Sequence, residues 1–396
     1  MQCQKCGLLQ STSGCSGTQV EYCVRCLSPL VHCTGKSLDV ALASAVAALL
    51  LLIPASFEPF LTTSTLGATR SSILPSSAFD LFDEGWPLLG MVVFLFVLVF
   101  PAIRFAAIAA VLSAIRFGAR PMWLGGAFRV ANALQIWAML DVFCLGSAVA
   151  YARLHASTNV TINTGAMCLM AATVSSLVMR AALDKRQVWR SIAPDSDPQV
   201  ASPSIVCLSC DFIAAAEREK APCPRCGAVL RGRRMDSTSR SMALLVAAVL
   251  LYLPANLYAI ATIPIDLTPT SYTVVGGIID LANARLFGLA ALVFCASFAI
   301  PILKMTGLSW CAMSTSPKKH LIAKTRIYRI IEEIGRWSMV DPFTIACFAP
   351  VMHYSALVDG RAGPAATPFA AVVILTILAV RSFDPRGMWD KAGCRE

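Results

Sequence analysis

Long apolar runs alternate with short polar segments along most of the chain. Eight of these runs are about as long as the 18 to 20 residues that a helix needs to cross roughly 30 Å of hydrocarbon. The pattern therefore predicts eight membrane-spanning helices and an all-α polytopic fold. The predicted spans are 38–57, 87–115, 130–153, 165–183, 241–262, 286–312, 337–357 and 366–383.

Composition supports this prediction and excludes an ordinary soluble protein. Of the 396 residues, 57% are hydrophobic and only 14% are charged, and the mean hydropathy is +0.67. Soluble globular domains carry about 25% charged residues. The chain is therefore expected to lie in a membrane.

The distribution of Lys and Arg predicts which ends face the cytoplasm. The chain starts with a polar cysteine pair rather than a basic and apolar leader, so no signal peptide is expected. Of the 33 Lys and Arg residues, only Arg70 and Arg361 fall well inside the predicted outer loops, with Arg153 and Arg285 at span ends. Because cytoplasmic loops collect positive charge, we expect both termini to be cytoplasmic in a bacterial inner membrane. The net charge of +10 then reflects this bias and an attraction to anionic lipid headgroups, and nucleic-acid binding is not expected.

The chain repeats itself at a shift of about 200 residues. Three motifs recur at this offset and share unlike residues in one register: 51–55 with 251–255, 101–104 with 301–304, and 137–143 with 337–343. Since each half holds an even number of predicted spans, both halves start on the same side and form a tandem parallel repeat.

The repeat divides the chain into two modules, each a small cytoplasmic zinc ribbon followed by a four-helix transmembrane bundle. The outer loop 58–85 is longer than its counterparts and rich in Ser, Thr and Pro, so we expect irregular or short-strand structure in the periplasm. The predicted units are ribbon 1 at 1–36, module 1 at 37–183, a linker at 184–206, ribbon 2 at 207–236 and module 2 at 237–396.

Eight of the sixteen cysteines form two matching sets of paired Cys-x-x-Cys motifs. The sets are Cys3, Cys6, Cys23 and Cys26, and Cys207, Cys210, Cys223 and Cys226. Two such pairs joined by a short excursion can place four sulfurs tetrahedrally around Zn²⁺, so two structural zinc sites are predicted. A redox dithiol and a rubredoxin-type iron site remain as alternatives.

Polar residues inside the predicted spans form a second candidate site. A charge in mid-membrane costs about 2.5 to 3.5 kcal/mol, so each one suggests a function and a partner. We predict a polar centre in which Lys304 pairs with Asp341, surrounded by Ser297, Ser338 and Thr376. The alternative is that Lys304 extends to the inner interface and Asp341 only caps or pins helices.

The first half lacks most of this polar set. It keeps Arg104 and Asp141 but has Val97, Ala138 and Ser176 at the positions of Ser297, Ser338 and Thr376. We therefore expect the second half to be the active one. The sequence contains no Walker loop, nucleophile elbow or dinucleotide fingerprint, so an enzyme is not expected.

Several motifs together resemble the paraquat-inducible protein A family, and the resemblance covers nearly the whole chain. They are the two four-cysteine sets and segments 253–256, 301–304, 334–341 and 383–386. The resemblance implies an inner-membrane protein that feeds phospholipids to a periplasmic tunnel of mammalian-cell-entry (MCE) domains between the two membranes of diderm bacteria. It also implies that protonation of Asp341 or Lys304 could be coupled to lipid movement.

Two other functions fit parts of the pattern. A membrane thiol oxidoreductase or redox stress sensor would use the Cys-x-x-Cys pairs, and its dithiols would be free of metal. A plain scaffold that only anchors the tunnel would tolerate the loss of Lys304 and Asp341 without losing lipid movement.

Overall fold

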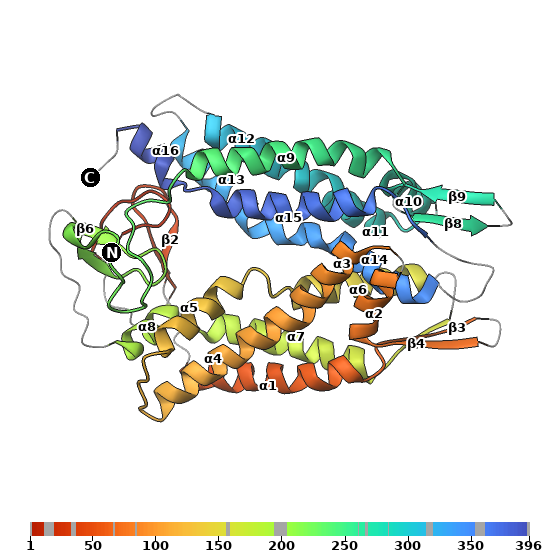
Figure 1. Ribbon diagram of the computed structural model, residues 1–396, viewed down its shortest axis with the longest axis horizontal. Helices are drawn as coiled ribbons and strands as arrows, with labels where there is room; N and C mark the ends of the chain where they lie inside the picture. The colour runs from red at the N-terminus through yellow and green to blue at the C-terminus, as the bar shows by residue number, and fades with distance from the viewer. Residues whose placement is uncertain are drawn as a thin grey trace.

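The computed structural model describes residues 2–11, 20–32, 37–65, 68–83, 85–155, 159–193, 204–259, 261–265, 268–283, 285–313, 320–352 and 361–393. Within these ranges the protein is mostly helical. Its two halves lie side by side, with the cysteine-bearing hairpins at one end and two small sheets at the other (Figure 1). The middle of the predicted linker, 194–203, and the predicted span end 353–357 lie outside the described residues.

The two halves have the same order of elements. The first consists of β1 (Val20–Tyr22), β2 (Pro29–His32), α1 (Leu38–Phe57), β3 (Leu61–Thr65), β4 (Ala68–Ser72), α2 (Leu74–Asp83), α3 (Pro87–Val93), α4 (Phe100–Arg116), α5 (Leu124–Leu134), α6 (Leu140–His155), β5 (Asn159–Ile162), α7 (Thr164–Ala182) and α8 (Lys185–Ile192). The second consists of β6 (Ser204–Val206), β7 (Ile213–Ala215), α9 (Ser237–Leu257), β8 (Ala261–Ile265), β9 (Thr268–Tyr272), α10 (Val274–Asn283), α11 (Phe287–Phe294), α12 (Ile300–Met313), α13 (Leu321–Ile334), α14 (Val340–Met352), β10 (Arg361–Ala362), α15 (Ala366–Ser382) and α16 (Arg386–Lys391).

Five helices in the described part of the chain are long and apolar enough to cross a membrane. They are Leu38–Phe57, Pro87–Arg116, Thr164–Ala182, Ser237–Leu257 and Phe287–Ala312. These helices agree with five of the eight predicted spans. The other three predicted spans correspond to the shorter helices α6, α14 and α15.

Two of the predicted spans are wrong as continuous helices. A turn at 135–139 separates α5 from α6 inside predicted span 130–153, and a 3₁₀ segment, Gly335–Met339, precedes α14 inside predicted span 337–357. The residues at the first break include Ile136, Trp137 and Ala138. Hydropathy cannot detect a helix break whose residues are apolar, because it measures the apolar character of a run and not its backbone conformation.

Both second spans contain a π-helical segment at equivalent positions, Phe94–Val99 and Cys295–Ala299. Each is followed by a proline, Pro101 or Pro301, whose nitrogen cannot donate the usual hydrogen bond to the preceding turn. The chain wraps more widely instead, and the N–H of Phe100 reaches the carbonyl of Leu95. The helix therefore continues through each proline, with a wider π-helical turn just before it.

The end of the molecule away from the cysteines carries two three-stranded antiparallel sheets, which the all-α prediction did not include. In the first, β3 lies between β4 and β5; in the second, β8 lies between β9 and β10. The prediction of short-strand structure within 58–85 is confirmed for β3 and β4. That loop also contains α2, which was not predicted.

The halves meet along α6 and α14, the third predicted span of each repeat. Equivalent residues contact each other there. The rings of Phe143 and Phe343 stack edge to face at 5.5 Å, and Ser147 Oγ lies 3.4 Å from Cys347 Sγ. Residues related by the 200-residue shift can touch only near a local two-fold axis, so the axis of the parallel repeat runs between these helices.

The cysteine-bearing segments pack on opposite halves. The first segment rests on the second half, where Lys5 Nζ lies 2.5 Å from Glu332 Oε2 of α13 and the Arg25 guanidinium lies over the Trp389 ring of α16. Its cysteines belong to the same apolar cluster as Trp389. The amino terminus thus crosses over to brace the carboxyl-terminal bundle.

The second cysteine segment makes the reciprocal contact. Arg129 of α5 donates from Nη1 to the carbonyl of Cys226 at 3.2 Å, and a Cβ at Gly125 would lie 3.0 Å from the carbonyl oxygen of Arg225. The close approach favours a glycine at this position in α5. The first cysteine segment therefore contacts the second half, and the second cysteine segment contacts the first half.

Candidate functional site

Lys304 is the centre of a buried polar cluster in the second half. The residue is 1% exposed. Its Nζ donates to Ser338 Oγ at 2.6 Å and to Thr376 Oγ1 at 3.2 Å. These hydroxyls come from the 3₁₀ segment Gly335–Met339 and from α15, so three separate elements converge on one cation.

The hydroxyl groups are oriented by their own backbone. Ser338 Oγ donates its proton to the carbonyl of Gly335 at 2.9 Å, and Thr376 Oγ1 donates to the carbonyl of Val373 at 2.9 Å. Since each hydroxyl has one proton and two lone pairs, both oxygens are left to accept from the ammonium. Two acceptors from two elements therefore hold the Nζ atom of Lys304 in place.

The structure places Asp341 and Ser297 close to this cluster. Ser297 lies in the π-helical segment, which packs against Gly335–Met339 and α14, and its Oγ donates to the carbonyl of Val293. Asp341 is buried in the first turn of α14.

The pairing of Lys304 with Asp341 stays a prediction. The 3₁₀ segment Gly335–Met339 runs without a break into α14, which begins at Val340, so Ser338 and Asp341 lie three residues apart in continuous helical backbone. Of these two side chains, Ser338 is the one that accepts a hydrogen bond from Lys304 in the described part of the chain.

A second charged cluster lies between the halves and was only partly predicted. Arg104 and Asp141 were noted as the counterparts of Lys304 and Asp341, but Asp141 pairs with Arg180 at 3.2 Å and with Arg336 at 3.5 Å. Arg336 comes from the second half. Its contact with the first half has no local sequence signal, whereas Arg180 could have been noticed as a charge in the last turn of apolar α7.

The cysteine sets have the geometry that a four-sulfur metal site requires. In each set all four cysteines are buried, and their sulfur atoms lie within 4.8 Å of one another. A tetrahedron with sulfurs about 2.3 Å from a central Zn²⁺ has sulfur separations of roughly 3.8 Å. The donor atoms therefore fit a metal ion in both sets.

The backbone around each Cys-x-x-Cys pair follows one repeated turn. In all four pairs, the residue after the second cysteine donates its N–H to the carbonyl of the first cysteine and has a positive φ. The four residues are Gly7 (82°), Leu27 (55°), Asp211 (59°) and Gly227 (69°). Leu27 and Asp211 adopt a conformation that disfavours their side chains, so the turn is imposed by the cluster rather than by local preference.

Comparison with known proteins gives matches over nearly the whole chain. It is 29% identical to intermembrane transport protein PqiA of Escherichia coli (strain K12), over 98% of this chain and 95% of the relative. It is 30% identical to lipophilic envelope-spanning tunnel protein A of the same strain, over 98% and 91%. A probable intermembrane transport protein of Haemophilus influenzae is 24% identical, over 94% and 91%.

No solved structure matches the chain. The sequence profile of paraquat-inducible protein A matches twice, at residues 38–193 and 238–393, once in each half. These two matches have the same offset as the internal repeat and include both charged clusters. The chain belongs to the paraquat-inducible protein A family.

Proposed function

We propose that this protein is the inner-membrane subunit of an MCE-type lipid transport system. It loads or extracts phospholipids for a periplasm-spanning tunnel between the inner and outer membranes. The observation that carries the proposal is the buried Lys304 cluster, because a fully enclosed cation among apolar spans is costly to keep without a function. The relatives that match nearly the whole chain are named intermembrane transport proteins, which supports the same conclusion.

In this proposal the polar centre, Lys304 with Ser338 and Thr376 and the neighbouring Ser297 and Asp341, is the moving part of the transport cycle. A proton gained or lost at Lys304 or Asp341 would change the charge that the three converging elements must accommodate. The elements would shift in response and move lipid. The first half, which has no equivalent hydroxyl cluster, would act as its support.

The two four-cysteine sets are proposed to hold structural Zn²⁺. All eight thiols are buried, and a closed four-sulfur site leaves no open position for chemistry. The alternative of a thiol oxidoreductase requires an accessible dithiol. Metal analysis of the purified protein distinguishes them, since about two zinc ions per chain would leave no free Cys-x-x-Cys pair.

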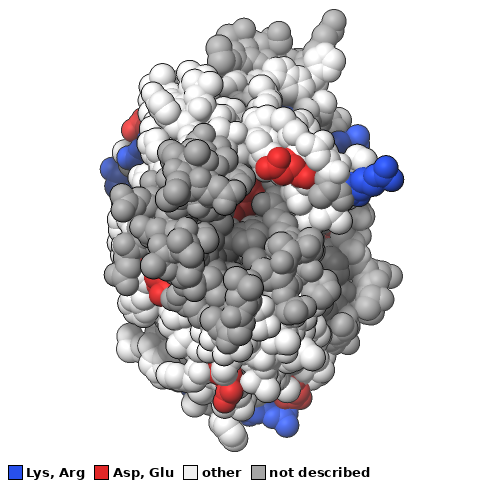
Figure 2. All heavy atoms as spheres, turned by 90° about the vertical axis from the view of Figure 1, so that its right-hand side faces the viewer, with Lys and Arg blue, Asp and Glu red and all other residues white. Residues whose placement is uncertain are grey.

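The cysteine end is proposed to face the cytoplasm and the sheet end the periplasm. Figure 2 shows the sheet end, where the visible Lys and Arg side chains lie at the rim. This position agrees with the positive-inside distribution in the sequence. The sheets β3–β4–β5 and β8–β9–β10 would then be available to contact the MCE partner.

The first test is transfer of labelled phospholipid from proteoliposomes that contain the protein and its MCE partner. Thr376→Val removes one acceptor of the Lys304 ammonium while keeping the side-chain shape. We expect transfer to fall by at least about tenfold, because a hydrogen bond to a charged group contributes about 1.5 to 3 kcal/mol. Lys304→Met and Asp341→Asn extend the series.

Thr173→Val is the matched control. Thr173 is a buried threonine of α7 whose hydroxyl donates to the carbonyl of Leu169, and it lies outside the polar centre. All variants are compared after equal folding and metal content have been confirmed. If Thr376→Val, Lys304→Met and Asp341→Asn all transfer lipid at the wild-type rate, the scaffold alternative is correct.

A further inference from the structure

A cavity of about 320 Å³ lies between the two halves at the cysteine end of the helices. Its charged lining comes from both halves and is mainly basic. The cationic lining residues are Arg180, Lys185, Lys304, Arg336 and Arg381, and the acidic ones are Glu332 and Glu333. A pocket of this size is at the small end of the range for ligand sites, which is roughly 300 to 1,000 Å³.

The positive charges around this cavity outnumber the available carboxylates. Asp141 is shared by the guanidinium groups of Arg180 and Arg336. Arg104, which is 2% exposed, interacts electrostatically with Asp141, Arg180 and Arg336. In the described part of the chain, the Nε atoms of Arg104 and Arg336 have no hydrogen-bond partner.

The other three cations of the lining donate hydrogen bonds only to neutral groups, and those of Lys304 go to the hydroxyls of Ser338 and Thr376. Lys185 Nζ donates to Gln135 Oε1 at 2.8 Å, and Arg381 Nη2 donates to the carbonyl of Ala133 at 3.4 Å. Both contacts connect the lining of the cavity to the carboxyl-terminal end of α5. Several cations are therefore held together without the negative charge that would balance them, an arrangement that an anion would stabilise.

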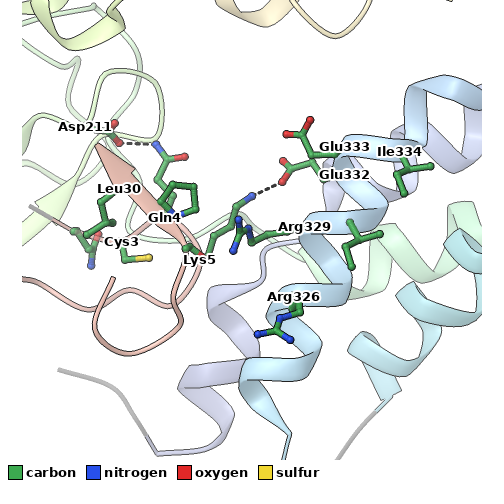
Figure 3. Close-up of a pocket in the computed structure, with 14 residues that line it drawn as sticks. Cys3, Gln4, Lys5, Leu30, Asp211, Arg326, Arg329, Glu332, Glu333 and Ile334 are labelled. Atoms are coloured by element: carbon green, nitrogen blue, oxygen red, sulfur yellow. Dashed lines mark hydrogen bonds and ion pairs between the residues drawn. The ribbon is translucent and has the colours of Figure 1, made fainter. Parts of the chain in front are cut away.

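The acidic residues of the lining do not remove this excess. Glu332 is engaged by Lys5 at 2.5 Å, which leaves Glu333 as the remaining carboxylate of the lining. A larger groove of about 640 Å³ adjoins the cavity, and the two share Gln4, Glu332 and Glu333. Figure 3 shows Lys5 reaching from the first cysteine segment across this groove to Glu332.

The position of the cavity matches the depth of lipid phosphates. Arg180 and Arg381 lie in the last turns of α7 and α15, where these apolar helices leave the membrane at the proposed cytoplasmic side. Phospholipid phosphates lie in this interfacial layer. The guanidinium group of arginine donates in a planar fork that fits phosphate oxygens, and Arg180 and Arg336 approach from opposite halves.

We propose that this basic cavity binds the phosphate group of a phospholipid from the inner leaflet, held between Arg180 of the first half and Arg336 of the second, with Lys185 and Arg381 beside it. The cavity holds the headgroup, and the acyl chains remain among the apolar helix surfaces. The lipid assignment rests on the proposed transport function. Inorganic phosphate has the same recognition chemistry, so the test must separate the two sources.

The test compares binding of phosphatidylglycerol, measured by native mass spectrometry, with binding of inorganic phosphate, measured by calorimetry. The full-length protein is used in neutral detergent, as wild type, Arg180→Gln, Arg336→Gln and Arg190→Gln. Arg190 is an exposed residue of α8 that does not line the cavity, so it controls for the loss of one charge. We expect Arg180→Gln and Arg336→Gln to weaken phosphatidylglycerol binding at least about tenfold and Arg190→Gln to leave it unchanged.

Asp141→Asn separates binding from folding. Removing the carboxylate frees Arg180 and Arg336, so a phosphate site should bind phosphatidylglycerol more tightly, whereas a purely structural cluster would show no gain. If phosphate binding is lost in the arginine variants while phosphatidylglycerol binding is unchanged, the lipid assignment is overturned. If neither ligand responds to the arginine variants, or Asp141→Asn shows no gain, the site is overturned. No tunnel partner is used, so failure of lipid transfer and failure of this site are distinguishable.

Discussion

At the scale of single residues, the two halves keep cations at equivalent positions but surround them differently. Lys304 is enclosed by two hydroxyls, whereas Arg104 lies beside two further arginines and one aspartate. Hydroxyls stabilise a single ammonium without neutralising it. A cluster of arginines around one carboxylate instead leaves unbalanced positive charge. The equivalent positions therefore carry one lysine held by hydroxyls and one arginine in a cluster that is suited to an external anion.

Lys185 gives this second centre a pH dependence. Its ammonium donates to Gln135 and is influenced by the charges of Arg104, Arg180 and Arg381, with Asp211 as the opposing charge. Partial desolvation of the ammonium at the cavity, together with repulsion from Arg104 and Arg180, lowers the pKa of Lys185 from 10.5 to about 8, and because the residue as a whole is exposed, solvent screens part of this effect. The site therefore loses one positive charge as the pH rises through about 8.

Binding of a phosphodiester should weaken over the same interval. An anion favours the protonated lysine, so we expect full affinity below pH 8 and a loss of several-fold above it. Glycerophosphoglycerol is a suitable probe, since a phosphodiester keeps its charge across this range. Lys185→Gln should bind more weakly at pH 7 and show no step near pH 8; a step that persists in this variant would contradict the assignment.

At the scale of elements, sequence analysis was most successful where the physical signal is continuous. Long apolar runs identified α1, α7 and α9, and cysteine spacing identified both four-sulfur clusters. It failed where the conformation depends on a local interruption. The turn at 135–139 leaves its run largely apolar, and the 3₁₀ segment Gly335–Met339 is a change of helix type that a hydropathy pattern does not record.

The crossed packing of the cysteine segments could not be predicted from sequence, because spacing does not reveal which half a segment contacts. It yields a test that distinguishes the two clusters. Binding of structural Zn²⁺ can contribute about 10 kcal/mol or more to the folding of such a segment. Cys23→Ser should therefore loosen α13 and α16 of the second half, and Cys223→Ser should loosen α5 and α8 of the first.

Hydrogen exchange followed by mass spectrometry measures this effect for each helix. Each variant serves as the control for the other, because both lose one thiol from an equivalent turn. We expect the larger increase in exchange of backbone amides in α13 for Cys23→Ser and in α5 for Cys223→Ser. The helix α8 also receives a contact from the first segment, because Arg186 Nη2 donates to the carbonyl of Leu30 at 3.0 Å, and α16 pairs with Arg233 through Asp390. Faster exchange in the half that follows each segment in the chain would show that the crossed contacts do not brace the bundles.

At the scale of the whole molecule, three kinds of contact join the halves. The helices α6 and α14 meet at the local two-fold axis, Asp141 pairs with Arg336, and the cysteine segments cross between bundles and touch through Gln4 and Asp211. The sequence alone predicts the repeat and shows which residues of the two halves are equivalent, including those at the axis. It does not predict the contacts between non-equivalent residues, such as Asp141 and Arg336. The 200-residue shift pairs equivalent positions but does not say which residues are neighbours in space.

Gly146 marks a close approach of α6 to α14 along this axis. A Cβ at this position would lie 3.0 Å from Phe343 Cβ and 3.1 Å from the carbonyl oxygen of Val340. We expect Gly146→Ala to force α6 away from α14 and to lower the free energy of unfolding by about 1 to 3 kcal/mol, as overpacking of a close contact does.

Gly126→Ala is the control for Gly146→Ala, and thermal unfolding in detergent compares them. Gly126 also lies in a helix, but nothing is within 4 Å of a Cβ built there. Because alanine favours a helix over glycine by about 0.5 to 1 kcal/mol, this control should raise the melting temperature while Gly146→Ala lowers it. If both variants raised the melting temperature equally, the two halves would have room to separate at the axis. The contact between α6 and α14 would then be a hinge that can open, and not a rigid contact.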